Sequence, residues 1–376
     1  MKYDIAIIGG GIMGSSIAYF LARTGQAGSI VVIEPDATYD LAATTKGAGG
    51  IRQLFSQPEN VAMSRYSLQF YREFPTTMAV DDKPIDIEFH QHGYLFVVGE
   101  TGAKQLEANY QVQTGHGVKA ELLDQATLQA KFPSLGCDDV ALACFSPEDG
   151  SISTTAALLA FRKKAESLGV TYIPSRAVAI EVNRQQVQSV QLEDGTSIEA
   201  DVFVNAAGAW ASEVSALAGM PLPITPLCRV KHFWSHSEVI EVLPLVKDES
   251  GLFFRPQGSG FVGGRPSWEI KQGFYFDPSR DDLKQYFQGY FERVVHPLLK
   301  IRAPVFEKAV CAESWIGHYA HNALDGNMIL GPWINGAPNF YVACGFSGHG
   351  VMHAPAVGLA LSELILNGHY STMNLT

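Results

Sequence analysis

The sequence predicts a mixed α/β fold, and three observations lead to this prediction. A strand, a glycine-rich turn, a helix and a second strand occupy residues 3–34. A small-residue turn near residue 205 and a glycine-rich turn near residue 345 each follow an apolar strand, whereas residues 221–315 are richer in proline, aromatic residues and short strands. We therefore expect a Rossmann-like domain built from discontinuous segments, plus a mostly antiparallel β-sheet domain.

The N-terminal unit is a βαβ arrangement. Residues 3–8 form a short apolar run of the kind found in buried parallel strands. A GGGIMG turn follows, and residues 15–25 then carry apolar side chains at helical spacing. Residues 29–34 are the second strand.

The remaining elements follow in order along the chain. Helices are expected at residues 59–74, 154–168, 281–292 and 351–366, and strands at 84–98, 170–173, 177–182, 187–192, 202–205, 230–234, 252–254, 261–263 and 339–344. The pattern places residues 1–80, 145–220 and 316–376 in the nucleotide-binding domain, and residues 81–144 and 221–315 in the substrate-binding domain.

Composition excludes several function classes. The net charge of −11 and the absence of a basic stripe argue against a nucleic-acid partner. No run approaches the roughly 18 apolar residues of a transmembrane helix. Five cysteines without a CxxC pair favour a reducing compartment, and the first residues lack a signal-peptide pattern. A cytoplasmic protein is expected.

The first turn matches the dinucleotide fingerprint G-x-G-x-x-G between a strand and a helix. Its glycines permit the tight turn, close approach of a pyrophosphate, and packing of the helix on the sheet. Glu34 lies 20 positions after the last glycine, where a carboxylate accepts hydrogen bonds from a ribose. The fingerprint alone does not separate a nicotinamide cofactor from a flavin. The predicted contacts are Gly9, Gly11, Ile12, Met13, Gly14 and Glu34.

Three later segments have the composition of cofactor-binding backbone. Residues 44–52 form a hydroxyl-rich and glycine-rich loop directly after the ribose-binding strand, with Thr44, Thr45 and Lys46 as polar contacts. Residues 205–210 form a small-residue turn after a buried strand, and residues 345–350 form a glycine-rich turn that opens a helix. A helix N-terminus of this kind stabilises negative charge. The alternatives are a surface loop, a tight crossover and a plain turn.

Four stretches carry a resemblance to a known superfamily along essentially the full chain. They are GGGIMGSSIAYFLA with Glu34, ATTKGAGGIRQLFSQPEN, VNAAGAWA, and GFSGHGVMHAPAVGLALSELI. The sequence resembles the D-amino-acid oxidase and sarcosine oxidase superfamily of FAD-dependent oxidoreductases. Within it, the chain is most similar to the branch of sarcosine oxidase β-subunit-like and proline dehydrogenase-like proteins, which also contains a mitochondrial assembly-factor relative.

The resemblance implies FAD, held non-covalently, and assigns parts of the cofactor to the loops. Gly49, Gly50 and Ile51 would contact the flavin ring, and Val178 the adenine. The turn with Ala207, Gly208 and Trp210 would meet the nucleotide half. The flavin's pyrimidine edge would lie against Gly345, Phe346, Ser347, Gly348, His349 and Gly350.

The catalytic candidates follow from the needs of an amino-acid substrate, whose buried carboxylate requires a cation or hydroxyl. Arg52 matches by position an arginine used in sarcosine oxidases, and Arg255 is the second candidate. Tyr319 lies where several amino-acid oxidases have a carboxylate-binding arginine, and His349 completes the set. In some relatives a cysteine near the position of His318 is linked covalently to the flavin, so a histidyl link is an alternative.

Two departures from sarcosine oxidases concern lysines. The chain has no lysine directly after the 345–350 turn and none in residues 260–264, where those enzymes place one to promote reaction with oxygen. Both departures argue against sarcosine specificity, and the second favours a dehydrogenase over an oxidase.

The sequence thus predicts an enzyme that oxidises the C–N bond of a D-amino acid, N-methyl amino acid, proline-like imino acid or opine by hydride transfer to flavin N5. Oxygen, a quinone or a partner protein would take the electrons. A 2-hydroxy-acid dehydrogenase and a flavin-stabilised assembly or subunit protein remain as alternatives. The histidine pairs 90/92 and 318/321 lack a third ligand in register, so no metal is predicted.

Overall fold

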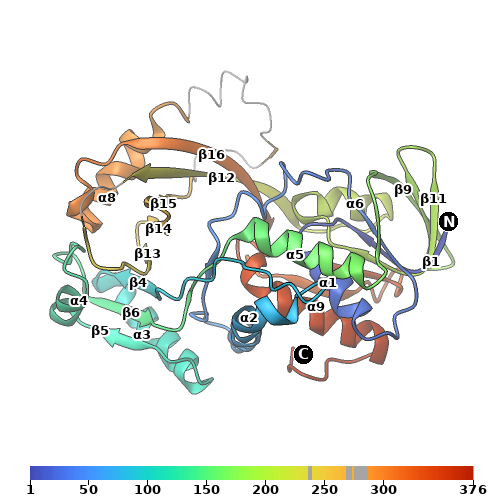
Figure 1. The fold of residues 1–376 in the computed structure, drawn as a ribbon, viewed down its shortest axis with the longest axis horizontal. Helices are drawn as coiled ribbons and strands as arrows, with labels where there is room; N and C mark the ends of the chain where they lie inside the picture. The colour runs from blue at the N-terminus through green and yellow to red at the C-terminus, as the bar shows by residue number, and fades with distance from the viewer. Residues whose placement is uncertain (236–238, 268–272, 275–286, 376) are drawn as a thin grey trace.

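A computed structural model of the chain describes residues 1–235, 239–267, 273–274 and 287–375. Two eight-stranded sheets lie at opposite ends of the molecule, with a layer of helices beside the first (Figure 1). A small two-stranded sheet pairs β3 (Gly50–Ile51) with β7 (Gly150–Ser151). The predicted mixed α/β fold class is confirmed.

The first sheet is built around parallel strands. Its central order is β17-β18-β11-β1-β2-β8, and a β9–β10 hairpin extends it antiparallel from β11. The strands are β1 (Lys2–Ile8), β2 (Ile30–Ile33), β8 (Thr171–Ile173), β9 (Ala177–Asn183), β10 (Gln186–Leu192), β11 (Ser197–Asn205), β17 (Ile329–Pro332) and β18 (Phe340–Cys344).

Both faces of the second half of β1, Ile5–Ile8, are buried, as its uninterrupted apolar sequence requires. Ile5 and Ile7 pack into the core shared with the helix layer, whereas Ala6 and Ile8 face a second core on the opposite side. The helix layer consists of α1 (Ile12–Ala22), α2 (Pro58–Thr77), α5 (Thr154–Ser167) and α9 (Gly350–Asn367), and the short α6 (Ala211–Leu217) covers the other face.

Helix α9 is the central helix of this layer. Its Gly358 allows a close approach to α1, because an added Cβ would lie 2.5 Å from the Ser16 hydroxyl. By length and composition alone α9 is long and apolar enough to cross a membrane, but 61% of it is buried inside the protein. Such burial is typical of a core helix.

The second sheet has the order β16-β12-β15-β14-β13-β4-β6-β5 and is antiparallel except where β13 pairs with β4. Trp234, Phe254 and Phe306 are central to its core. The strands are β4 (Tyr94–Val98), β5 (Glu121–Leu123), β6 (Leu142–Ser146), β12 (Ile224–Ser235), β13 (Leu245–Asp248), β14 (Phe253–Gln257), β15 (Gly260–Gly264) and β16 (Cys311–Asn322). The accompanying helices are α3 (Glu100–Gly115), α4 (Gln125–Lys131), the π-helical turn Phe291–Val295, α8 (His296–Arg302) and the 3₁₀ turn Pro304–Phe306.

Strands β12 and β16 connect the two ends of the molecule, running from the second sheet toward the first (Figure 1). The carboxyl end of β16 meets the turn after β18, where the Ser347 amide donates to the Ala320 carbonyl at 2.9 Å. The loops that follow the strands of the first sheet therefore face side chains of the second sheet.

Most predicted elements are confirmed, with several differences. Residues 84–93 are not a regular strand, and only Tyr94–Val98 of the expected 84–98 segment pairs in the sheet. Helices α3, α4 and α8 and strands β5, β6, β13, β16 and β17 were not predicted. Half of the helix expected at 281–292, residues 281–286, lies outside the described residues.

The predicted division of the chain into two domains remains a prediction, but the sheet to which each strand belongs bears on it. Strand β16 belongs entirely to the second sheet, although the expected boundary at residue 316 divides it.

Candidate active site

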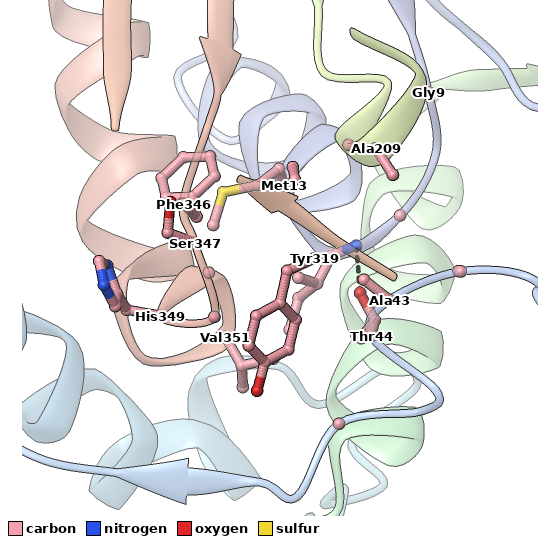
Figure 2. Close-up of a pocket in the computed structure, with 18 of the residues that line it drawn as sticks. Gly9, Met13, Ala43, Thr44, Ala209, Tyr319, Phe346, Ser347, His349 and Val351 are labelled. Atoms are coloured by element: carbon pink, nitrogen blue, oxygen red, sulfur yellow. Dashed lines mark hydrogen bonds between the residues drawn. The ribbon is translucent and has the colours of Figure 1, made fainter. Parts of the chain in front are cut away.

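A cavity of about 810 Å³ lies between the two sheets. On one side it is lined by backbone beyond the carboxyl ends of β1, β2 and β11, the edge at which parallel sheets bind ligands. On the other side it is lined by side chains of β12, β13 and β14. Figure 2 shows Tyr319 in the middle of the lining, between Thr44 and His349.

The β1–α1 turn is as tight as the fingerprint requires. Gly9 has a φ of +101°, and a Cβ there would lie 2.6 Å from the Ala206 carbonyl oxygen. A Cβ at Gly14 would lie 1.8 Å from the Gly9 oxygen. Gly11 differs, because only the Thr44 hydroxyl comes within 4 Å of its Cβ position. Gly11 and the N-terminus of α1 therefore leave room for a ligand's phosphates.

Glu34 lines the cavity at the end of β2. Its Oε2 accepts from the Gly10 amide at 2.8 Å, and its Oε1 accepts from the Asp36 amide at 2.9 Å. Burial raises the pKa of this carboxyl above its ordinary value. The two amides fix the carboxylate beside the turn, where a ribose hydroxyl can also reach it.

The 44–51 loop is only partly turned toward the cavity. Thr44, Gly49 and Gly50 line it, as predicted contacts should. Thr45 instead donates its hydroxyl to the Tyr39 carbonyl at 2.7 Å, and Lys46 packs its side chain against Gly317. Six of the predicted site residues do not line the cavity: Gly14, Thr45, Lys46, Ile51, Arg255 and Gly345.

The turn after β11 lines the cavity through Ala207, Gly208 and Trp210. Val178, on the neighbouring β9, also lines it and is 45% exposed. This end of the cavity is open to solvent, as the adenine end of a bound dinucleotide can be.

The 345–350 turn forms the wall opposite the loop with Thr44. Ser347 and Gly348 have positive φ angles of +47° and +100°. A Cβ at Gly348 would lie 2.6 Å from the Tyr319 ring, so glycine allows this ring to pack against the turn. His349 is neutral, because burial lowers the pKa of its ring to about 3, assisted by the nearby charges of Arg52 and Lys247.

Arg52 lines the cavity, as expected for a substrate-binding cation. Its guanidinium lies over the Phe55 ring at 3.9 Å and donates to the Leu54 carbonyl. The buried carboxylate of Asp149 lies nearby and accepts two hydrogen bonds from Gln53, both at 2.9 Å. Arg52 is thus held in one place while facing the cavity.

Arg255 has a different position from the one expected. Its Nε donates to the Ala48 carbonyl, and its other two nitrogens donate to the Pro256 carbonyl at 2.7 Å and to Gln257 Oε1 at 2.9 Å. With all three nitrogens engaged, the side chain fastens the 44–51 loop to β14. This geometry indicates a positioning residue.

Five cations that sequence reasoning did not place in the site line the same cavity: Arg176, Arg229, Lys231, Lys247 and Arg265. Arg229 and Lys231 alternate on β12, so they project from the same face of the strand. An Arg-x-Lys pair inside an otherwise apolar strand is the signal that could have identified them. Residues 260–264 contain no lysine, but Lys231 lies on the adjacent strand. A Cβ at Gly264 would lie 3.7 Å from the Lys231 Cα.

His318 lies on β16 next to Tyr319, and successive strand residues point to opposite faces. Tyr319 lines the cavity and His318 does not. The position expected for a histidyl–flavin link therefore faces away from the cavity. No group of three His, Cys, Asp or Glu side chains within the described ranges is arranged to hold a metal ion.

Comparison with known proteins identifies the family. The family described as "FAD dependent oxidoreductase" matches residues 4–364. This chain belongs to that family. It is 35% identical over 413 residues to the FAD-dependent oxidoreductase domain-containing protein 1 of Bos taurus, covering 100% of this chain and 83% of that protein.

Two further relatives extend the comparison. Human mitochondrial dimethylglycine dehydrogenase is 29% identical over 397 residues, covering 98% of this chain but only 43% of that protein. The crystal structure of L-proline dehydrogenase from P. horikoshii superposes with a TM-score of 0.84 at 26% identity, covering 99% of this chain and 95% of that chain.

The cavity fits the cofactor of this family of FAD-dependent oxidoreductases. Gly11 leaves open space at the N-terminus of α1, which has no side-chain cap of its own. Glu34 supplies a fixed carboxylate for the ribose, and the 345–350 turn supplies the N-terminus of α9 at the far end of the same cavity. Phosphates and a reduced, negatively charged ring would thus each lie against a helix N-terminus.

Proposed function

We propose that this protein oxidises the C–N bond of a small amino acid or secondary amine: a D-amino acid, N-methyl amino acid, proline-like imino acid or opine. The observation that carries the proposal is the composition of the cavity. Its glycine-lined half fits FAD, and its other half combines cations such as Arg52 with the aromatic rings of Tyr94 and Phe253. An amino acid offers the matching groups, a carboxylate and an apolar body.

The side chains around the cavity would bind and prepare the substrate. Arg52 binds the carboxylate, while Tyr94 and Phe253 exclude water from the carbon that is oxidised. The surrounding positive charges disfavour a bound ammonium ion, and hydride leaves more readily from the neutral amine. When bound, FAD accepts that hydride.

The names of two relatives support an amine substrate. A dimethylglycine dehydrogenase and an L-proline dehydrogenase are both similar to this chain over nearly its full length. The proposal carries their substrate class, an amino acid with a secondary or tertiary nitrogen, over to this protein as a hypothesis.

Anaerobic reduction of the bound flavin tests the proposal. Holoprotein is mixed with a panel of amino acids and N-alkyl amino acids of both configurations, and in parallel with 2-hydroxy acids. Loss of flavin absorbance with an amine supports the proposal. Reduction by 2-hydroxy acids alone would replace it with the hydroxy-acid alternative. No reduction by any small molecule would favour a flavin-stabilised assembly or subunit role.

The electron acceptor is tested with the same protein after reduction. Reoxidation in air-saturated buffer is compared with reoxidation by a soluble quinone. Since Lys231 lines the cavity beside β15, the absence of lysine from residues 260–264 does not by itself select a dehydrogenase.

A further inference from the structure

The side chain of Lys247 enters the cavity from the second sheet. Residues of β13 alternate between two faces, so Leu245 and Lys247 line the cavity whereas Val246 packs in the core of the second sheet. Asp248 is on the same face as Val246, where its carboxylate accepts a hydrogen bond from Arg302 at 3.2 Å. The acidic residue next to Lys247 in the chain is therefore turned away from the amine of this lysine.

The amine of Lys247 takes no part in holding the fold together. Among the residues that the structure describes, its Nζ donates no hydrogen bond and forms no ion pair, and the centre of the Phe96 ring lies 5.8 Å from it. Lys231, the other lysine of the lining, differs because its amine donates to the Lys46 carbonyl. Lys247 is thus the lysine whose amine is available to a ligand.

Positive charge acts on Lys247 from two other elements. The Arg52 guanidinium lies 5.4 Å from the centre of the same Phe96 ring, and Arg229 acts on the lysine from β12. Burial, followed by the charges of these two arginines, lowers the pKa of Lys247 to about 8. The titratable groups beside it are uncharged, because burial raises the pKa of Tyr94 to about 12 and lowers that of His349 to about 3.

Asp149 supplies negative charge to Arg52 and not to Lys247. Its carboxylate acts on the pKa of Arg52 and accepts two hydrogen bonds from Gln53, but it is not among the charges that act on Lys247. An arginine does not lose its proton in proteins. Arg52 can therefore bind a carboxylate without titrating, whereas the lysine beside it exchanges a proton near neutral pH.

We propose that the amine of Lys247 is the general base that takes the proton from the ammonium group of the substrate. This inference rests on the proposed function, in which Arg52 binds the carboxylate of the same amino acid. The proton moves from the substrate nitrogen to Nζ of Lys247, and the nitrogen keeps the electron pair. This pair forms the C=N bond as hydride leaves the carbon for bound FAD, so the product is an iminium ion and the proton stays on the lysine.

The two charges of the substrate drive this proton transfer together. Its carboxylate, bound at Arg52, brings negative charge near Lys247 and favours the protonated lysine. The guanidinium groups of Arg52 and Arg229 disfavour the ammonium form of the substrate. Both effects move the proton from the substrate to the lysine. The arginines cannot accept it, and the ring of His349 is too weak a base.

The pH dependence of flavin reduction tests the proposal. Holoprotein is mixed anaerobically with low concentrations of an amino acid that reduces the flavin. We expect the rate to rise as the pH increases through about 8, where Lys247 loses its proton. Lys247→Arg keeps the charge but cannot accept a proton, so its rise should move up to the pKa of the free substrate amine, with a rate at pH 8 at least about tenfold below the parent's.

The same variant should recover at high pH. Above the pKa of the free amine the substrate arrives without the proton, so the rate of Lys247→Arg should approach that of the parent. Lys247→Met is a second test, since it should lack the rise near pH 8 whatever its affinity for the substrate. Lys163→Arg, at an exposed position on α5, is the control and should keep the parent profile.

Ligand binding separates proton transfer from charge and folding. Methylthioacetate has a carboxylate but no nitrogen to oxidise, and its binding is followed in the visible spectrum of the flavin. Lys247→Arg should bind it as tightly as the parent at pH 6, where both side chains are charged, and Lys247→Met should bind it more weakly. A parent-like pH profile of reduction in Lys247→Arg, with loss only in Lys247→Met, would show that Lys247 acts through its charge alone and would overturn the proposal.

The outcomes distinguish failure of this inference from failure of the proposed function. Reduction by amines with an unshifted pH profile in both Lys247 variants rejects the base and keeps the function. Loss of the rise near pH 8 in Lys231→Arg but not in Lys247→Arg assigns the base to Lys231 and rejects the proposal. No reduction of the parent by any amine rejects the function and, with it, the base.

Discussion

The side-chain amine of Lys231, on β12, donates a hydrogen bond to the backbone carbonyl of Lys46, in the loop that follows β2. This contact joins the second sheet directly to the cofactor-binding loop. The same ammonium faces the cavity and the Tyr319 ring. A buried lysine in this position couples its protonation to whatever anion the cavity holds.

Lys231 predicts a pH dependence of ligand binding. Burial, with the charges of Arg229 and Arg255, lowers its pKa to about 7, so in the free protein it loses its charge as the pH rises through about 7. Binding of methylthioacetate, an unreactive carboxylate, should therefore weaken from pH 6 to pH 9. In Lys231→Met the decline near pH 7 should disappear, leaving only the one near pH 8 from Lys247. Spectral titrations across this range measure both. An unchanged profile in the variant would contradict the assignment.

The lowered pKa also has a consequence for stability. The unfolded chain holds the lysine proton up to about pH 10.5, whereas the folded protein loses it near pH 7. Between these values the unfolded state binds more protons, so this group makes the protein more stable as the pH rises. Lys231→Met should reduce that rise in thermal midpoint, and a variant with the same slope as the parent would argue against it.

Gly14 predicts a steric effect at the fingerprint. A Cβ at this position would lie 1.8 Å from the Gly9 carbonyl oxygen, so Gly14→Ala must displace the turn. We expect a loss of about 3 kcal/mol in unfolding free energy together with loss of bound FAD. Gly115→Ala, at the exposed end of α3 with no atom within 4 Å, should change stability by less than about 0.5 kcal/mol. Denaturant unfolding and flavin content measure both variants.

Glu34 predicts a specific loss of cofactor affinity. Glu34→Gln keeps the shape of the side chain but replaces one acceptor oxygen and removes the charge that a ribose hydroxyl would meet. The dissociation constant of FAD should rise about tenfold or more. Titration of apoprotein with FAD measures the change, and Glu193→Gln, an exposed substitution of the same kind, is the control. Equal affinities for both variants would remove Glu34 from the ribose site.

The different positions of Arg52 and Arg255 predict different effects on ligand binding and FAD retention when each is replaced by methionine. Arg52→Met should weaken binding of methylthioacetate about tenfold or more while FAD remains bound, because Arg52 faces the cavity. Arg255→Met should release the Ala48 carbonyl and weaken retention of FAD more than ligand affinity. Ligand titrations and FAD dissociation rates measured on both variants compare the two roles. The reverse pattern would restore Arg255 as the substrate-binding residue.

Much of the fold could be predicted because its signals are local. The βαβ unit combines apolar strands with a glycine turn whose conformation few other residues adopt, as the φ of +101° at Gly9 shows. Helix α3 gave no such signal, since among its residues only Leu106 and Gln113 are buried and no apolar stripe results. Helix α4 is short, and its only marker is the Asp124 cap on the Thr127 amide.

The site could be predicted where backbone makes the contacts and less well where side chains do. Glycine-rich turns are recognisable in the sequence, and most of the predicted turn residues line the cavity. Which face a strand residue presents depends on register across the sheet, as with Arg255 on β14 and Arg229 on β12. The second sheet assembles from strands far apart in the chain, so its contribution to the cavity emerged only in the folded structure.

The flavin content of the purified protein tests most directly whether the separated glycine turns build one FAD site. After reconstitution with FAD and removal of the excess, acid precipitation should release one FAD per chain into a yellow supernatant, as a single non-covalent dinucleotide site requires. A protein that stays colourless after reconstitution, or that gives up its flavin to a nicotinamide dinucleotide, would contradict the account.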